Sequence, residues 1–177
     1  MKIQLALASL SFVVALALVM PASADVGLGG GALIGTGVDT GDVDNNPYRL
    51  QLGAYGELDI GNFLVGVRGT RSVASNDDCV KGDKSCPNVR DLRTIGGDVG
   101  YIWHLPLIHF GPRLGIGHLK EKDGDRVGAY FEPGASLDVH LLVFNVGAEV
   151  RYRFVTGTDG DLNAFLAYLR LGLHFGG

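Results

Sequence analysis

Residues 143–155 read VFNVGAEVRYRFV, and their side chains separate by position into an apolar and a polar set. The apolar set is Phe144, Val146, Ala148, Val150, Tyr152 and Phe154, and the residues between them are Asn145, Gly147, Glu149, Arg151 and Arg153. Successive side chains of a β-strand point to opposite faces, so a period of two predicts a strand. One face of this strand is apolar and the other is charged.

The same period recurs along the chain after residue 24. The segments that show it are 26–38, 48–59, 62–74, 92–104, 108–119, 127–140, 143–155 and 162–175. Each is long enough to supply the roughly 9 to 11 residues that a tilted strand needs to cross a bilayer. No stretch in this part keeps a helical repeat for three turns. The sequence therefore predicts eight antiparallel strands.

The connections between these segments alternate between short and long. Short turns fall around Gly61, Leu105-Pro106-Leu107 and Leu141-Leu142, and longer polar connections cover about 39–47, 75–91, 120–126 and 156–161. This pattern puts the tight turns and both termini at one end and the long loops at the other, which is the layout of an outer-membrane barrel. Periodicity alone leaves open a soluble barrel or sandwich with the apolar face inward.

The first residues have the order of a secretory signal peptide. A positive charge at Lys2 precedes an apolar run from Ile3 to Met20, and Pro21-Ala22-Ser23-Ala24 follows. Small residues at this place are typical of a cleavage site, so we expect residues 1–24 to be removed and 25–177 to form one domain. A single spanning helix is the alternative interpretation, because the run approaches the length that a bilayer requires.

Charge and cysteine content narrow the possible functions. Lys and Arg number 15 against 19 Asp and Glu, for a net charge of −4, so a nucleic-acid binder with a basic face is not expected. An exported chain meets an oxidising compartment, and we therefore expect a disulfide between Cys79 and Cys86. Two sulfurs with no histidine nearby make a poor zinc site, so neither a metal nor a cofactor is expected.

With its even number of strands, signal peptide and alternating turns, the mature chain resembles the eight-stranded OmpA/OmpX-type outer-membrane β-barrel family. The resemblance implies an all-β fold: an eight-stranded antiparallel up-and-down transmembrane β-barrel in the outer membrane of a Gram-negative-type bacterium. It also implies outer-membrane lipid, lipopolysaccharide and the barrel-assembly machinery as partners, a monomer, and a structural or surface-interaction role without catalysis. Ala164 to Phe175 is similar to the final strand that the assembly machinery reads, although Gly176 and Gly177 extend beyond it.

In such a barrel the charged face lines the lumen. The ionic residues expected there are Arg49, Glu57, Arg68, Asp98, Arg113, Glu132, Asp138, Glu149, Arg151, Arg153 and Arg170. Eight strands leave an interior that side chains can fill, so we expect opposite charges to pair and close it. A conducting pore is the alternative. Glycines at 27, 29, 31, 35, 37, 115 and 117 are expected to give room to long inward side chains.

The long loops are acidic. They include Asp39, Asp42, Asp44, Asp77, Asp78, Asp123, Asp125, Asp159 and Asp161, which would form an acidic rim. Such a rim is solvated by default, and it would attract divalent cations or basic partners. Calcium bridging to lipopolysaccharide phosphates is a hypothesis.

Candidate catalytic residues give only a weak signal. Ser136, Asp138 and His140 share one face of one strand, but alternate residues lie roughly 7 Å apart, too far for nucleophile activation. The remaining histidines, His104, His109, His118 and His174, are scattered over strands and are interpreted as girdle or lumen residues. The expected interfacial girdles contain Tyr48, Phe63, Tyr101, Trp103, Phe110, Tyr152, Phe154 and Phe175.

Two other functions stay open at this point. One is a soluble periplasmic or secreted barrel of lipocalin type that binds an apolar ligand in its interior. The other is a lipid-modifying enzyme in a barrel of this size, similar to lipid-A deacylases, although their His-x-Ser arrangement has no match in this chain.

Overall fold

The computed structural model describes residues 25–40, 46–72, 92–121, 127–157 and 162–176. Its strands are β1 (Val26–Asp39), β2 (Gln51–Ile60), β3 (Phe63–Ser72), β4 (Leu92–Tyr101), β5 (Trp103–His104), β6 (Ile108–Glu121), β7 (Val127–Leu141), β8 (Phe144–Thr156) and β9 (Ala164–Phe175). Among these residues, no helix is long and apolar enough to cross a membrane. The predicted signal peptide, the predicted disulfide and most of the acidic rim lie outside the described residues.

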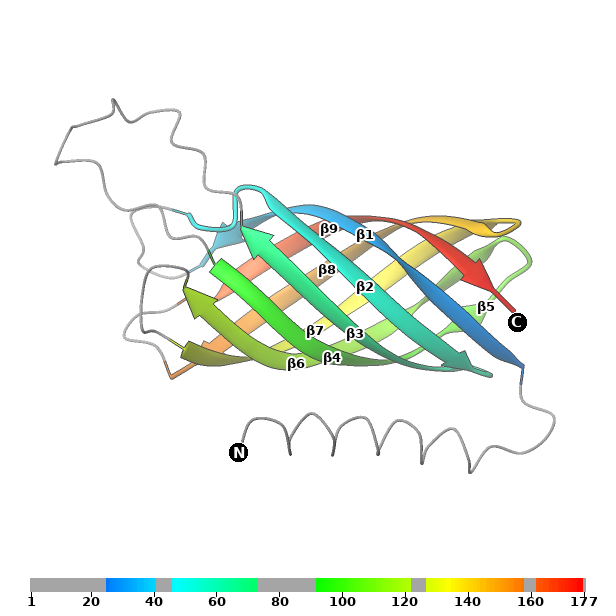
Figure 1. The fold of residues 1–177 in the computed structure, drawn as a ribbon, viewed down its shortest axis with the longest axis horizontal. Helices are drawn as coiled ribbons and strands as arrows, with labels where there is room; N and C mark the ends of the chain where they lie inside the picture. The colour runs from blue at the N-terminus through cyan, green and yellow to red at the C-terminus, as the bar shows by residue number, and fades with distance from the viewer. Residues whose placement is uncertain (1–24, 41–45, 73–91, 122–126, 158–161, 177) are drawn as a thin grey trace, which may run out of the picture.

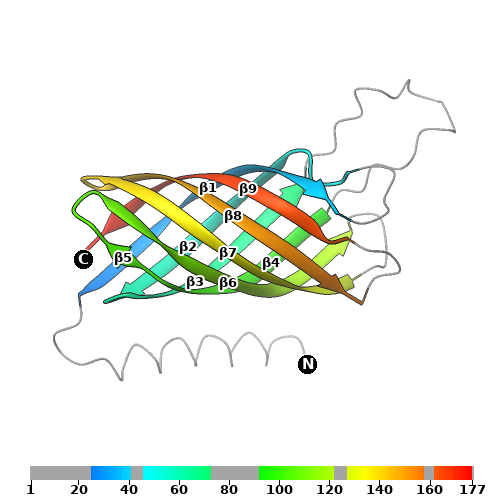
Figure 2. The same cartoon turned by 180° about the vertical axis from the view of Figure 1, so that it is seen from behind.

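The strands form one closed antiparallel barrel (Figures 1 and 2). Apart from β4 and β5, each strand pairs with its neighbour in sequence, and β1 pairs with β9 and β4 with β6 to close the barrel. The short β5 continues β4 after a break at Ile102 and also pairs with β6. Eight strands therefore close the wall, which confirms the predicted fold.

The break at Ile102 is held by the turn that follows β2. The backbone N–H of Ile102 donates to the Asn62 carbonyl oxygen at 2.7 Å, and the Asn62 side-chain amide donates to the Ile102 carbonyl oxygen at 2.8 Å. Both backbone groups of Ile102 are therefore satisfied although they leave the ladder.

Apolar side chains face outward and charged side chains face the lumen. Leu52, Val146 and Leu169 are 45%, 42% and 46% exposed, whereas Arg151 and Glu57 are 1% and 8% exposed. This is the orientation predicted for a membrane barrel. It is the reverse of a lipocalin-like barrel, whose apolar face would line an internal ligand cavity.

Three tight turns join strands at the end of the barrel where β9 finishes (Figure 1). Gly61 takes the left-handed conformation between β2 and β3, at a φ of 58°. Leu105 and Ile108 exchange backbone hydrogen bonds across the second turn. Between β7 and β8 the turn residues are Leu142 and Val143, one position later than predicted, and Leu142 itself has a φ of 60°.

The largest departure from the predicted strands precedes β2, which begins at Gln51 rather than at residue 48. The side-chain amide of Asn46 donates to the Gly37 carbonyl oxygen at 2.6 Å, and its side-chain oxygen accepts the Tyr48 backbone N–H at 3.0 Å. This local turn replaces the strand ladder. Tyr48 is consequently a fully buried lumen residue and not a girdle residue, because its hydroxyl donates to the Leu162 carbonyl oxygen at 2.8 Å.

The end that carries the tight turns also carries a ladder of exposed aromatic rings. Phe63, Tyr101, Trp103 and Phe110 follow one another across β3, β4, β5 and β6 with successive ring centroids 5.4 Å apart. A band of aromatic rings is typical of a barrel's membrane interface.

Candidate functional site

The lumen is filled in three layers along its length. Near the long-loop end it holds apolar and aromatic side chains: Leu33, Tyr48, Leu92, Leu119, Tyr130, Leu162, Ala164, Leu166 and Tyr168. The middle holds paired charges, and the end with the tight turns holds a pocket lined by histidines. The candidate functional site is this filled lumen.

Ten of the eleven predicted ionic residues lie in the middle layer. Each has an exposed fraction of 8% or less: Glu57, Arg68, Asp98, Arg113, Glu132, Asp138, Glu149, Arg151, Arg153 and Arg170. They comprise five arginines and five carboxylates, so the layer is neutral as a whole. Ion pairs within 4 Å connect all ten into a single network.

Arg49 is the one predicted member that lies outside the network. Its side chain is exposed, in the bend that precedes β2. The prediction was wrong because it assumed that the strand begins at residue 48, in which case the alternation of side chains would turn Arg49 inward. The turn formed by Asn46 and Tyr48 delays the start of β2, so Arg49 precedes the strand.

Glu149 on β8 is the central carboxylate of the network. Its Oε1 accepts hydrogen bonds from Arg68 Nη1 and Arg151 Nε, each at 2.5 Å, and its Oε2 accepts from Arg170 Nη1 at 2.9 Å. The three arginines come from β3, β8 and β9, so this carboxylate links opposite walls of the barrel.

Arg170 on β9 is the central arginine of the network. Its guanidinium donates to Asp138 Oδ1 at 2.9 Å, to Glu149, and to both carboxylate oxygens of Glu57 at 2.8 and 2.9 Å. Its Cζ also lies 4.2 Å from the centroid of the Tyr55 ring. A planar guanidinium can bond several carboxylates in its plane while it stacks on an aromatic face.

Tyrosines separate the charged layer from the apolar layer. Arg153 pairs with Glu132 and lies 5.0 Å from the Tyr130 ring centroid and 5.5 Å from that of Tyr48. Burial raises the pKa of the Tyr48 hydroxyl, which lies outside the strands, to about 12, although nearby Arg153 opposes the shift. The phenol therefore stays protonated and keeps its bond to the Leu162 carbonyl oxygen.

Inward glycines provide the space for these side chains, as predicted. A Cβ placed on Gly35 would lie 2.3 Å from the Tyr168 ring, and one on Gly115 would lie 2.7 Å from both Arg151 Nη1 and Asp98 Oδ1. Any larger residue at these two positions would displace the tyrosine or the ion pair.

Ser136, Asp138 and His140 are engaged separately rather than as a relay. Ser136 Oγ accepts from Arg113 Nε at 2.6 Å, and the Asp138 carboxylate pairs with Arg170 and Arg113. His140 instead stacks on the ring of His109, with centroids 3.9 Å apart. Ser136 and Asp138 thus contact arginines of the lumen network, and the ring of His140 contacts another histidine.

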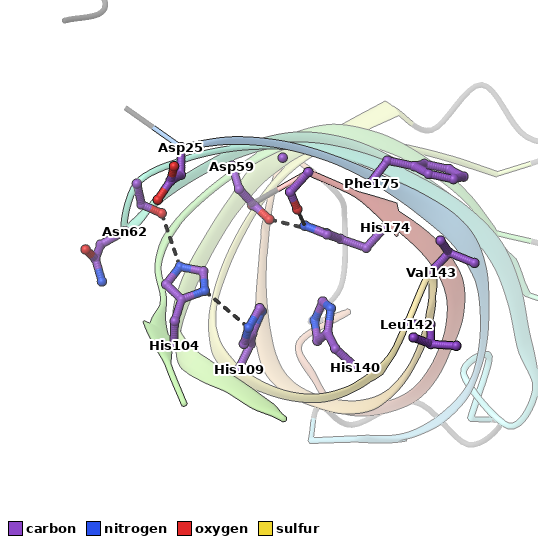
Figure 3. Close-up of a pocket in the computed structure, with 13 residues that line it drawn as sticks. Asp25, Asp59, Asn62, His104, His109, His140, Leu142, Val143, His174 and Phe175 are labelled. Atoms are coloured by element: carbon purple, nitrogen blue, oxygen red, sulfur yellow. Dashed lines mark hydrogen bonds and ion pairs between the residues drawn. The ribbon is translucent and has the colours of Figure 1, made fainter. Parts of the chain in front are cut away.

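Four histidines from three distant parts of the sequence gather in the pocket at the turn end, which encloses about 670 Å³. Figure 3 shows their side chains. They are His104, His109, His140 and His174, and they come from β5, β6, β7 and β9. His174 Nδ1 lies 3.5 Å from Asp59 Oδ2 on β2. Sequence reasoning missed this cluster and treated three of its members as scattered, although each lies close to a predicted tight turn or to the end of the last strand. His118 is exposed on the outer face of β6.

The described residues contain no three His, Cys, Asp or Glu side chains already arranged around a single metal position. Cys79 and Cys86 lie outside the described residues, as do Asp42, Asp44, Asp77, Asp78, Asp123, Asp125, Asp159 and Asp161 of the predicted rim. Only Asp39 of the rim is described, at the end of β1.

Comparison with known proteins supports the architecture. No protein-family model and no curated protein sequence matches the chain. Among solved structures, it is similar to the N-terminal β-barrel domain of OprF from Pseudomonas aeruginosa, with a TM-score of 0.60 and 12% identity over 86% of this chain and 100% of that one. Neisserial surface protein A gives a TM-score of 0.54 and 13% identity over 84% of this chain and 95% of that one. Ail, the attachment invasion locus protein of Yersinia pestis, gives a TM-score of 0.52 and 15% identity over 86% of this chain and 99% of that one. The fold is that of the eight-stranded outer-membrane barrels.

Proposed function

We propose that this chain is an integral outer-membrane protein whose lumen is closed and whose role is structural or depends on surface interactions of its loops, without catalysis. The observation that carries the proposal is the division of its side chains, with an apolar outer wall around a neutral, paired ionic interior. A protein folded for water would place these two surfaces the other way round.

The outer wall matches a lipid environment. Every membrane-length strand contributes a large apolar side chain that is well exposed, for example Leu28, Leu52, Val67, Ile95, Ile116, Leu137, Val150 and Leu169. Contiguous apolar surface on this scale would aggregate in water, whereas acyl chains solvate it.

The interior supports a closed barrel rather than a pore. Arg151 and Glu149 are both 1% exposed and bonded to each other, and the apolar layer around Leu119 and Leu166 closes the lumen above them. An ion would have to break several buried pairs to pass, at a cost of several kcal/mol for each charge left without a partner.

The proposed partners follow from the same placement. Outer-membrane lipid and lipopolysaccharide would surround the wall, and the assembly machinery would act on the last strand, Ala164–Phe175. We expect a monomer, because a closed barrel leaves no sheet edge for another chain to pair with. The acidic loops would meet cations or basic partners at the cell surface.

Cell fractionation tests the placement. The full chain expressed in a Gram-negative host should sediment with the outer membrane, dissolve only in detergent, and migrate differently on a gel before and after boiling. Recovery in the soluble periplasmic fraction would contradict the proposal.

Two further measurements test the closed and non-catalytic character separately. Purified protein in planar lipid bilayers should produce no steady current, and lasting open-channel steps would show that the lumen conducts. Lipid A from expressing cells should have an unchanged mass, whereas loss or gain of an acyl chain would point to an enzyme.

A further inference from the structure

The histidine pocket at the turn end contains a pair of imidazoles held at the spacing of metal ligands. His104 and His109 face each other across a hairpin, as register partners in β5 and β6. Their Nδ1 and Nε2 atoms lie 3.3 Å apart (Figure 3). The short turn between them is fixed by the two hydrogen bonds that Leu105 and Ile108 exchange.

The distance between these two nitrogen atoms matches the distance between two nitrogen ligands of one zinc ion. Zinc binds histidine nitrogen at about 2.0–2.1 Å and prefers tetrahedral angles, which places two nitrogen ligands about 3.3–3.4 Å apart. The His104–His109 separation is 3.3 Å, so an ion could replace the hydrogen bond between the rings with little movement of either backbone.

Further ligands lie within reach of side-chain rotation. The His140 ring centroid is 3.9 Å from that of His109, and the His174 ring is 4.9 Å from His140. Asp25 and Asp59 line the same pocket and supply negative charge near a divalent cation. Because no three ligands are prearranged among the described residues, the third would come from rotation of His140 in the open pocket or from water.

We propose that this pocket binds a divalent transition metal of the class that prefers imidazole, with Zn²⁺ as its representative. His104 Nδ1 and His109 Nε2 are the primary ligands, and His140 is the recruited third. The proposal does not depend on the placement in the membrane, because it rests on the hairpin and the pocket alone. Hard cations such as Ca²⁺ and Mg²⁺, which prefer oxygen ligands, should not bind here.

Isothermal titration calorimetry tests the site on the folded, detergent-solubilised full chain prepared without a histidine tag. Titration with ZnCl₂ at pH 7.5 should give one tight site, which His104→Gln or His109→Gln weakens at least tenfold. His118→Gln, which removes an exposed histidine on the outer face of β6, should leave the affinity unchanged. The titrations are repeated with Cys79→Ser and Cys86→Ser together, so that zinc held by thiols is recognised.

Three results would overturn the proposal: no heat above dilution, equal affinity in the His104→Gln and His109→Gln variants and the unsubstituted chain, or loss of binding only in the cysteine variant. Heat-dependent gel migration verifies that each variant is folded. If His109→Gln does not fold, His104→Gln alone tests the site, because His104 is exposed and its replacement should leave the barrel intact. X-ray absorption at the zinc edge should report at least two imidazole ligands. Binding should also weaken at pH 5, where protons compete with zinc for the imidazoles.

Discussion

Replacing Glu149 with glutamine removes the charge at the centre of the lumen network while it preserves the side chain's shape. Glu149 accepts hydrogen bonds from Arg68, Arg151 and Arg170 and is 1% exposed. In the variant, five buried arginines would face four carboxylates. The amide oxygen can still accept from Arg68 and Arg151, but the amide NH₂ group then points its donors toward Arg170, which is itself a donor.

The expected loss follows from the cost of an uncompensated buried charge. Removing one partner of a buried ion pair typically destabilises a protein by about 3–5 kcal/mol. Three arginines share Glu149, and none of them can reach water at this depth. We therefore expect Glu149→Gln to lower the free energy of unfolding by about 3–5 kcal/mol.

Urea unfolding in phospholipid vesicles measures this difference, with gel migration and Trp103 fluorescence as two readouts of the same transition. Asp25→Asn is the matched control, because it converts an exposed carboxylate to an amide. It should change stability by less than about 0.5 kcal/mol.

A double variant separates charge imbalance from lost packing. Arg68→Gln together with Glu149→Gln restores equal numbers of positive and negative groups, so the double variant should be more stable than the sum of the two single losses by about 0.5–3 kcal/mol. Additive losses, or a loss below about 1 kcal/mol for Glu149→Gln alone, would refute the argument that the charges hold the lumen closed.

Three smaller predictions concern positions where backbone or burial is decisive. Gly35→Ala should destabilise the barrel by about 1–3 kcal/mol in the same urea assay, because the added Cβ would lie 2.3 Å from the Tyr168 ring. Gly56→Ala should be tolerated, because the atom nearest to its added Cβ is 4.0 Å away. Leu142→Gly should stabilise the barrel by about 1 kcal/mol, because Leu142 has a φ of 60° that glycine adopts without strain, and an unchanged midpoint would contradict this. The Tyr48 phenol should ionise only near pH 12, so its contribution to stability is complete below pH 10 and is lost as the pH rises toward 12. Ultraviolet titration of the wild type against Tyr48→Phe measures the pH at which this phenol ionises, and ionisation near pH 10 would contradict the prediction.

The alternation of residues predicted the wall of the barrel well, because each strand has one face in lipid and one in the lumen. Val146 and Glu149 illustrate this, since the period of two alone assigns them to opposite faces. Sequence reasoning failed where a side chain interrupts the backbone ladder. Asn46 bonds the backbone on both sides of its turn, so the strand starts late and Arg49 falls outside the lumen.

The partners inside the lumen could not be predicted from the same pattern. Arg68 and Glu149 are 81 residues apart and meet across the barrel. Which inward residues share a level depends on the stagger between all the strands around the wall, a property that no single strand contains. The histidine pocket was missed for the same reason, because its members belong to four strands and meet only when the barrel closes.

Quenching of tryptophan fluorescence by brominated lipid tests the orientation of the wall most directly. In a Trp103→Phe background, tryptophan is placed either at Phe131, which is 44% exposed, or at Tyr130, which is 4% exposed and lies one residue earlier on β7 at nearly the same depth. The Phe131→Trp variant should be strongly quenched by acyl chains brominated near that depth, and the Tyr130→Trp variant should be nearly unaffected. Equal quenching at the two positions, or stronger quenching for Tyr130→Trp, would contradict an apolar wall facing lipid around a charged lumen.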